Sequence, residues 1–118
     1  MQEEKIILGI DPGTSIMGFG LVKKKGANFE MIMMDVLILN KLNDPYLKLQ
    51  KIFQKTLAII DHYNPDEVAL EAPFFGKNVQ SMLKLGRAQG VAMAAALQRE
   101  IPVTEYAPLK IKKSITGR

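Results

Sequence analysis

The stretch from residue 9 to residue 20, Gly-Ile-Asp-Pro-Gly-Thr-Ser-Ile-Met-Gly-Phe-Gly, constrains the fold more than any other part of the chain. It follows an apolar run at residues 6–8 that is typical of a buried strand, and it puts Asp11 where that strand ends. Pro12 and Gly13 favour a turn, because Pro fixes its φ and Gly accepts backbone angles closed to other residues. A second strand then begins, with Gly18 and Gly20 on one face. We expect a strand-end acid beside bare backbone, open to another backbone or to a polyphosphate or nucleic-acid strand.

A second strand-end acid strengthens this interpretation, because a lone Asp-Pro-Gly turn is most often only a hairpin. Residues 68–73, Val-Ala-Leu-Glu-Ala-Pro, repeat the arrangement with Glu71 at the end of a short apolar strand and a Pro that stops it. Two such acids, far apart in sequence, can meet at one edge of a sheet. Paired carboxylates of this kind are good ligands for Mg²⁺ or Mn²⁺.

The composition is that of one globular domain spanning residues 1–118. Apolar residues make up 47% and charged residues 24%, which excludes a disordered or fibrous class. Cysteine is absent, so disulfides and thiolate metal sites are excluded and a reducing compartment is indicated. The sequence has no apolar run of membrane-spanning length, and its N-terminus lacks the form of a signal peptide. We therefore expect a cytoplasmic protein with no membrane partner.

The net charge of +4 is concentrated at one end of the chain. Residues 109–118 carry four basic side chains and no acidic one, whereas the remaining residues carry 12 of each sign. Such a cluster is compatible with phosphate contact and equally with a solvated helix face or tail.

The order of periodic segments predicts an α/β fold. Residues 23–28 suit a hairpin loop, and residues 29–39 have apolar side chains on both parities, as in a long strand covered on both faces. Asp44 and Pro45 are typical of a helix start, and the helical spacing continues to about residue 62. A strand ending at Glu71, a helix over residues 79–100 and a strand over 102–106 follow. This βββαβαβ order predicts a mixed five-stranded sheet: three antiparallel strands and then two βα crossovers, flanked by helices.

Two further segments carry candidate functional residues. Phe74 and Phe75 lie between a Pro and a Gly and precede Lys77; an exposed aromatic there can stack on a nucleobase, although one ring is expected to pack on the core. The long helix is rich in small residues, and Gly86 and Gly90 share one face at a cost of roughly 1 kcal/mol each against Ala. That cost indicates close approach of another element, either the sheet or a second copy of the helix.

Taken together, four motifs resemble the RuvC family of bacterial Holliday-junction resolvases. They are Gly-Ile-Asp-Pro-Gly-Thr with Gly-Phe-Gly at residues 9–20, Leu-Glu-Ala-Pro-Phe with Gly-Lys-Asn at 70–78, Lys-Leu-Gly-Arg-Ala-Gln-Gly at 84–90, and Glu-Tyr-Ala-Pro at 105–108 followed by Lys112. The resemblance covers nearly the whole chain. It implies a ribonuclease H-like fold, a homodimer, and magnesium-dependent nicking of four-way junction DNA in recombination and repair, with Mn²⁺ as a substitute ion and branch-migration helicases as partners.

The resemblance also implies roles for individual residues. Asp11 and Glu71 match two of the family's four catalytic, metal-binding carboxylates, and Phe74 matches an aromatic that contacts junction bases. Lys77 and Asn78 extend that DNA-binding loop, and Lys112 matches a basic position associated with DNA. The helix that holds Gly86 and Gly90 matches the dimerisation helix.

The resemblance further predicts a longer protein, truncated here before a C-terminal helix with the other two carboxylates. Hydrolysis between two metal ions needs several carboxylates, so we expect the 118-residue chain alone to be inactive or nearly so. The missing helix would leave part of the sheet uncovered and the chain prone to aggregate. Two alternatives remain: a catalytically empty branched-DNA-binding protein of the same fold, and an actin-like ATPase domain, whose phosphate loop also has the form Asp-x-Gly-Thr.

Overall fold

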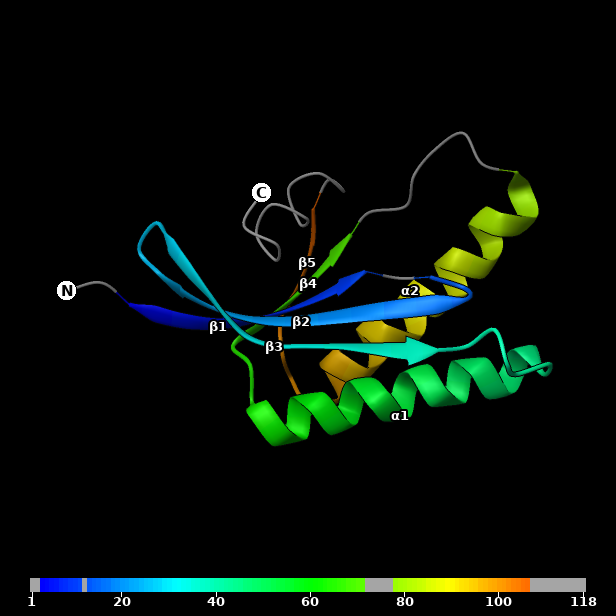
Figure 1. Ribbon diagram of the computed structural model, residues 1–118, viewed down its shortest axis with the longest axis horizontal. Coiled ribbons are helices and arrows are strands. Elements are labelled where there is room, and N and C mark those ends of the chain that lie inside the picture. The colour runs from blue at the N-terminus through cyan, green and yellow to red at the C-terminus, as the bar shows by residue number, and fades with distance from the viewer. Residues whose placement is uncertain (1–2, 12, 72–77, 107–118) are drawn as a thin grey trace.

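The computed structural model describes residues 3–11, 13–71 and 78–106, and it contains five strands and two helices within those ranges. Figure 1 shows their arrangement. The elements are β1 (Glu4–Asp11), β2 (Ile16–Lys25), β3 (Asn28–Ile38), α1 (Pro45–Tyr63), β4 (Glu67–Glu71), α2 (Val79–Gln98) and β5 (Val103–Tyr106).

The five strands form one mixed sheet in the order β3-β2-β1-β4-β5. β1, β2 and β3 pair antiparallel as a meander, whereas β4 pairs parallel with β1 and β5 pairs parallel with β4. The predicted fold class is therefore confirmed. β1 lies at the centre of the sheet, and its C-terminal end is next to the C-terminal end of β4 (Figure 1).

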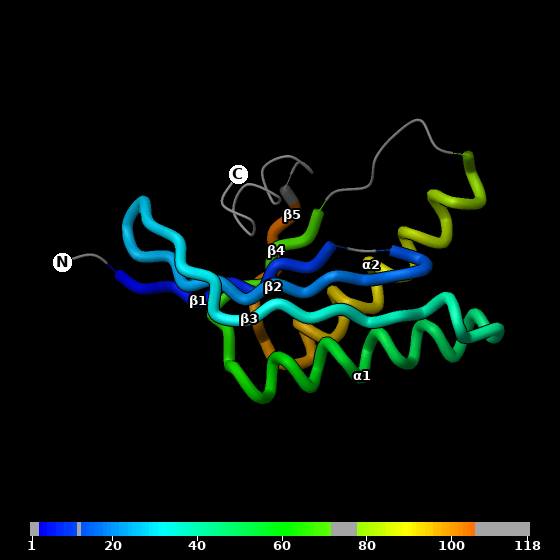
Figure 2. The backbone as a smooth tube through the Cα atoms, in the orientation of Figure 1, coloured from blue at the N-terminus to red at the C-terminus, as the bar shows by residue number. Residues whose placement is uncertain are grey.

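Both helices lie on one face of the sheet (Figure 2), and the hydrophobic core is formed between them and that face. The strands contribute side chains that alternate along them, as a period of two requires. The helices contribute apolar stripes, and α2 brings only alanines to the innermost positions. The core includes Leu8, Ile10, Phe19, Val68 and Leu70 from the strands, and Ile52, Ile59, Ile60, Ala88, Ala92 and Ala96 from the helices.

The opposite face is exposed along β3, which corrects the prediction of a strand covered on both faces. The pairing of β2 with β3 shifts register between Leu21 and Val22, so that Ile32 is an extra residue on β3. Because of this extra residue, the odd-numbered positions before the bulge and the even-numbered positions after it lie on the same face of the sheet. We call the result the β3 apolar patch: Ile16, Phe29, Met31, Met34, Val36 and Ile38, which are 39–61% exposed.

Local sequence signals explain the ends of the elements. The carboxylate of Asp44 accepts hydrogen bonds from the N–H groups of Tyr46 and Leu47 at α1's start, as predicted, and Asn64 ends α1 in a left-handed conformation. The hairpin between β2 and β3 is tighter than predicted, because β2 continues to Lys25 and only residues 26–27 form the turn. Neither helix in the described ranges is long and apolar enough to cross a membrane.

Candidate active site at the ends of β1 and β4

The two strand-end acids lie on neighbouring strands. β1 and β4 are parallel and in register up to Ile10 and Leu70, and Asp11 and Glu71 are the next residue on each. Ile10 and Leu70 are fully buried on the helix-covered face, so by alternation both acids are on the opposite face. Asp11 is exposed and Glu71 is half-buried. The fold thus brings together, at one edge and on one face, two acids separated by 60 positions in the sequence.

Gly18 keeps the space beside Asp11 free of side-chain atoms. It is the partner of Asp11 in the antiparallel pairing of β1 with β2, and a Cβ added to Gly18 would lie 3.6 Å from the Cβ of Asp11. That separation is ordinary van der Waals contact, so an alanine would fit and a larger side chain would extend over the carboxylate. The backbone beside the acid is bare, as the sequence predicted.

Gln89 of α2 anchors the strand end that carries Glu71. Its side chain is 4% exposed, and its Nε2 donates a hydrogen bond of 3.1 Å to the main-chain carbonyl of Glu71. The carboxylate oxygen Oε2 of Glu71 is also buried. Sequence reasoning missed Gln89. The available signal was a lone amide between Ala88 and Gly90, on a helix whose small neighbours leave it room to be buried.

The two acids suit a divalent cation but do not complete a site for one. Carboxylate oxygens are the ligands that Mg²⁺ and Mn²⁺ prefer. Nowhere in residues 3–11, 13–71 and 78–106 do three or more His, Cys, Asp or Glu side chains gather in a way that could hold a metal ion. Asp11 and Glu71 would therefore supply part of a ligand set.

The other predicted site residues have different outcomes. Phe74, Lys77 and Lys112 lie outside the described residues. Asn78 is the N-cap of α2, and its side-chain oxygen accepts a hydrogen bond of 2.8 Å from the N–H of Ser81, which gives it a structural role. Gly86 and Gly90 are exposed, and a Cβ on either would meet nothing within 4 Å. The sheet is therefore not the element that approaches these two glycines.

Comparison with known proteins decides the family. A family model described as "Crossover junction endodeoxyribonuclease RuvC" matches residues 7–118. The chain belongs to the RuvC family. It is similar to the RuvC protein of Bacteroides fragilis, with 67% identity over 115 residues that cover 98% of this chain and 61% of that protein. It is also similar to RuvC of Christiangramia forsetii, with 64% identity over 117 residues that cover 99% of the chain and 61% of the relative. The chain thus spans about three fifths of these relatives' length.

Solved RuvC structures have the same fold. The structure described as "T. thermophilus RuvC in complex with Holliday junction substrate" superposes with a TM-score of 0.82 at 25% identity, covering 92% of this chain and 68% of that one. The yeast mitochondrial Holliday junction resolvase Ydc2 superposes with a TM-score of 0.63 at 16% identity, covering 92% and 52%, and shares the fold. The ribonuclease H-like architecture expected from the sequence is therefore that of known RuvC proteins.

Proposed function

We propose that this chain forms the catalytic core of a structure-selective endonuclease, which resolves four-way DNA junctions by metal-dependent hydrolysis of phosphodiester bonds. The observation that carries the proposal is the pair Asp11 and Glu71, at the ends of adjacent parallel strands in a member of the RuvC family. A relative bound to a Holliday junction substrate supports the choice of DNA.

The two carboxylates would hold Mg²⁺, or Mn²⁺ in its place, at the sheet edge. When bound, such an ion supplies electrostatic stabilisation of the charge that develops on a phosphate during hydrolysis. Exposed Asp11 can reach a phosphate in solvent, whereas Glu71 is held by a strand end whose carbonyl is fixed by Gln89. Gly18 leaves room for a DNA backbone to approach Asp11 from the β2 side. Without a cation, these acids would repel the substrate.

Conservative replacement of each acid tests the proposal in the complete gene product. Asp11→Asn and Glu71→Gln should each lower cleavage of a synthetic four-way junction by at least about 100-fold, since a metal ligand is lost while the shape is kept. Junction binding should persist. Both variants should also weaken Mn²⁺ binding measured by calorimetry, a readout that does not depend on activity.

Glu105→Gln is the matched control. Glu105 is exposed near the same edge, but it pairs with Leu70 and so belongs to the other face of the sheet. Its replacement should leave cleavage and Mn²⁺ binding unchanged. Wild-type protein that binds junctions and cleaves none would instead identify a catalytically empty DNA-binding protein. Nucleotide binding and hydrolysis without DNA binding would identify the ATPase.

The 118-residue chain should bind the metal loosely and cleave poorly. Asp11 and Glu71 supply two carboxylate groups, whereas a two-ion site for phosphodiester hydrolysis uses several. Cleavage by this chain in Mg²⁺ at the rate of the complete gene product would contradict the expectation.

A homodimer through α2 is part of the proposal. Gly86 and Gly90 lie one turn apart on an exposed face, where nothing in the described chain comes within 4 Å of an added Cβ, so a second helix could approach closely. Replacing both by Leu should prevent dimerisation measured by sedimentation equilibrium, whereas Gln80→Leu at the helix start should not.

By family resemblance we further propose a cytoplasmic location and branch-migration helicases as partners.

A further inference from the structure

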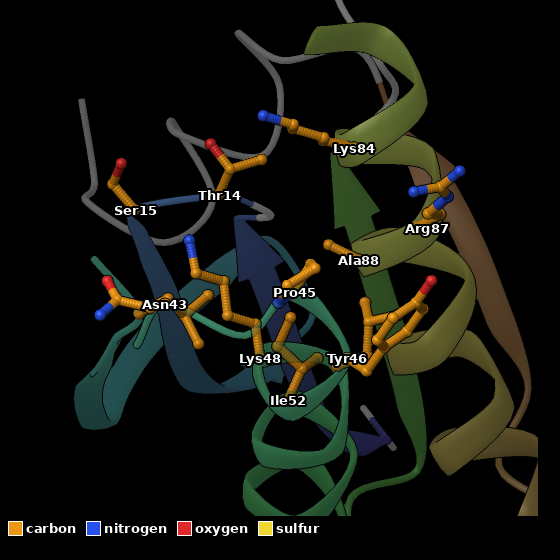
Figure 3. A pocket seen from close by; sticks show the side chains of 13 residues that line it. Thr14, Ser15, Asn43, Pro45, Tyr46, Lys48, Ile52, Lys84, Arg87 and Ala88 are labelled. Carbon is orange, nitrogen blue, oxygen red and sulfur yellow. The ribbon is translucent and has the colours of Figure 1, made fainter. Parts of the chain in front are cut away.

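A cavity of about 730 Å³ lies on the helix side of the sheet, next to the turn that follows Asp11. Figure 3 shows it from close by. Three segments of the described chain line it: the turn of residues 13–15 between β1 and β2, the start of α1 with the loop before it, and α2 around residues 84–88. The turn that follows Asp11 therefore lies between the acid edge and this cavity, and it forms one wall of the cavity.

Among the described residues, the cavity is lined by three cations and by no acidic side chain. Lys48 of α1 and Lys84 of α2 both extend toward the turn that carries Thr14 and Ser15 (Figure 3), and Arg87 lies one turn further along α2. None of the three cations has an ion pair with any residue in the described part of the chain, although Lys48 is half-buried. Three unpaired cations from two helices, beside two hydroxyl groups, form a site that attracts an anion.

The floor and rim of the cavity indicate what else the anion would carry. Leu39 and Ile52 are each 1% exposed and form an apolar floor with Ala88. Tyr46 is 78% exposed at the rim, although it stands at a helical spacing that would suit a buried position. An exposed aromatic ring above an apolar floor can stack on a nucleobase, and the cations suit the phosphate attached to it.

We propose that this cavity binds a nucleotide of the DNA strand next to the strand held at the acid edge. Lys48, Lys84 and Arg87 neutralise the phosphate of this nucleotide and those of its neighbours in the strand, and Tyr46 stacks on its base. The assignment rests on the proposed nuclease function, and it deepens that function by giving the substrate a second anchoring point. Because residues 13–15 connect the two sites, DNA seated in the cavity fixes the register of the strand that meets Asp11 and Glu71.

The test measures junction binding by the complete gene product over a range of salt concentrations. A cation that neutralises one phosphate contributes about one unit to the slope of log K against log salt. Lys48→Gln and Lys84→Gln should each reduce the slope by about one unit, and Lys84→Arg should restore it. Lys51→Gln is the matched control, since Lys51 is exposed on α1 one turn from Lys48 and outside the cavity. Tyr46→Ala should weaken binding at least about fivefold, and Tyr46→Phe should not.

Two outcomes would overturn the assignment. If the salt slopes of Lys48→Gln and Lys84→Gln equal that of the wild type, the cavity binds no DNA phosphate. The cavity would instead be assigned to a small molecule if the wild type bound a free mononucleotide, Lys48→Gln bound it more weakly, and junction binding were unchanged in that variant. Asp11→Asn separates this test from that of the nuclease: it should lower cleavage at least about 100-fold and leave the salt slope intact. An Asp11→Asn variant that still cleaves would refute the catalytic proposal and not the cavity.

Discussion

At the scale of single residues, the acid edge depends on what surrounds the acids as much as on the acids themselves. Gly18 keeps a side chain away from Asp11, and Gln89 fixes the main chain at Glu71. Neither residue brings charge or a metal ligand of its own. Measurements of metal or DNA binding are therefore needed to distinguish these proposed roles from a contribution to folding alone, because loss of a purely structural contribution would not change the binding of the folded protein.

Two substitutions at Gly18 can distinguish a role in metal binding from a role in folding. Gly18→Ala should leave Mn²⁺ binding near that of the wild type, because the added Cβ would lie 3.6 Å from the Cβ of Asp11. Gly18→Val should weaken Mn²⁺ binding and junction cleavage at least about tenfold by covering the carboxylate, while β-branching in a strand maintains stability. Calorimetry and thermal unfolding on the same samples check both expectations. Equal Mn²⁺ affinity in the two variants would show that the bare backbone has no function at this site.

Gln89→Met tests the anchor. The substitution keeps the volume and removes the donor to the Glu71 carbonyl, so the free energy of unfolding should fall by about 1 to 3 kcal/mol. If Gln89 positions Glu71, Mn²⁺ affinity should also fall at temperatures where the variant is fully folded. Gln80→Met, at an exposed position of the same helix, should change neither quantity. A loss of stability with unchanged Mn²⁺ affinity would make Gln89 a purely structural residue.

At the scale of elements, α2 uses small residues on two faces for different purposes. Ala88, Ala92 and Ala96 are at most 3% exposed and let the helix pack closely on the sheet and on α1. Gly86 and Gly90 are on the exposed side, where they weaken the helix and pack against nothing in the described chain. The sequence showed that the helix was rich in small residues, but it did not show which of them face the core.

Replacing both exposed glycines by Ala should therefore stabilise the monomer. Each change should raise the free energy of unfolding by up to about 1 kcal/mol, because Ala has the higher helix propensity and its Cβ meets no other atom. Urea denaturation at low protein concentration measures this, and Ala94→Gly, at another exposed position of α2, should have the opposite effect. A destabilised double variant would mean that the glycines have a packing role within one chain.

The C-terminal ends of the two helices are joined by an ion pair that makes stability depend on pH. Arg99 donates to both carboxylate oxygens of Asp61, at 2.7 and 3.2 Å, and this hydrogen bonding lowers the pKa of Asp61 below its ordinary value of 3.8. A lowered folded-state pKa stabilises the protein above pH 3.8, and that contribution is lost as the pH falls through the folded-state pKa.

Arg99→Gln should thus be less stable than the wild type at pH 7, and the difference should shrink as the pH falls below 3.8. Urea denaturation from pH 7 to pH 2.5 measures the difference at each pH. The Lys55–Asp35 pair, which also lowers the pKa of an acid, is present in both proteins and cancels. A difference that stays constant to pH 2.5 would show that Arg99 acts through packing and not through charge.

At the scale of the whole molecule, the sequence predicted the topology because each element has a local signal and the order of elements permits few arrangements. It also predicted that Asp11 and Glu71 end strands. It could not show the bulge at Ile32, because the choice between the two phases of β3 depends on its pairing with β2. Nor could it show the cationic cavity, since Lys48 and Lys84 come together only when α1 and α2 cover the same face.

The bulge has a consequence for the behaviour of the isolated chain. The β3 apolar patch exposes six large apolar side chains on one surface, an arrangement that favours self-association. Met34→Thr with Val36→Thr should reduce aggregation of the 118-residue chain, measured by light scattering against concentration, because Thr suits a strand and is more polar. Leu97→Gln removes a comparably exposed side chain from α2, and it should have little effect, since Leu97 lies outside the patch. Equal aggregation in the double variant and the wild type would mean that self-association proceeds through another surface.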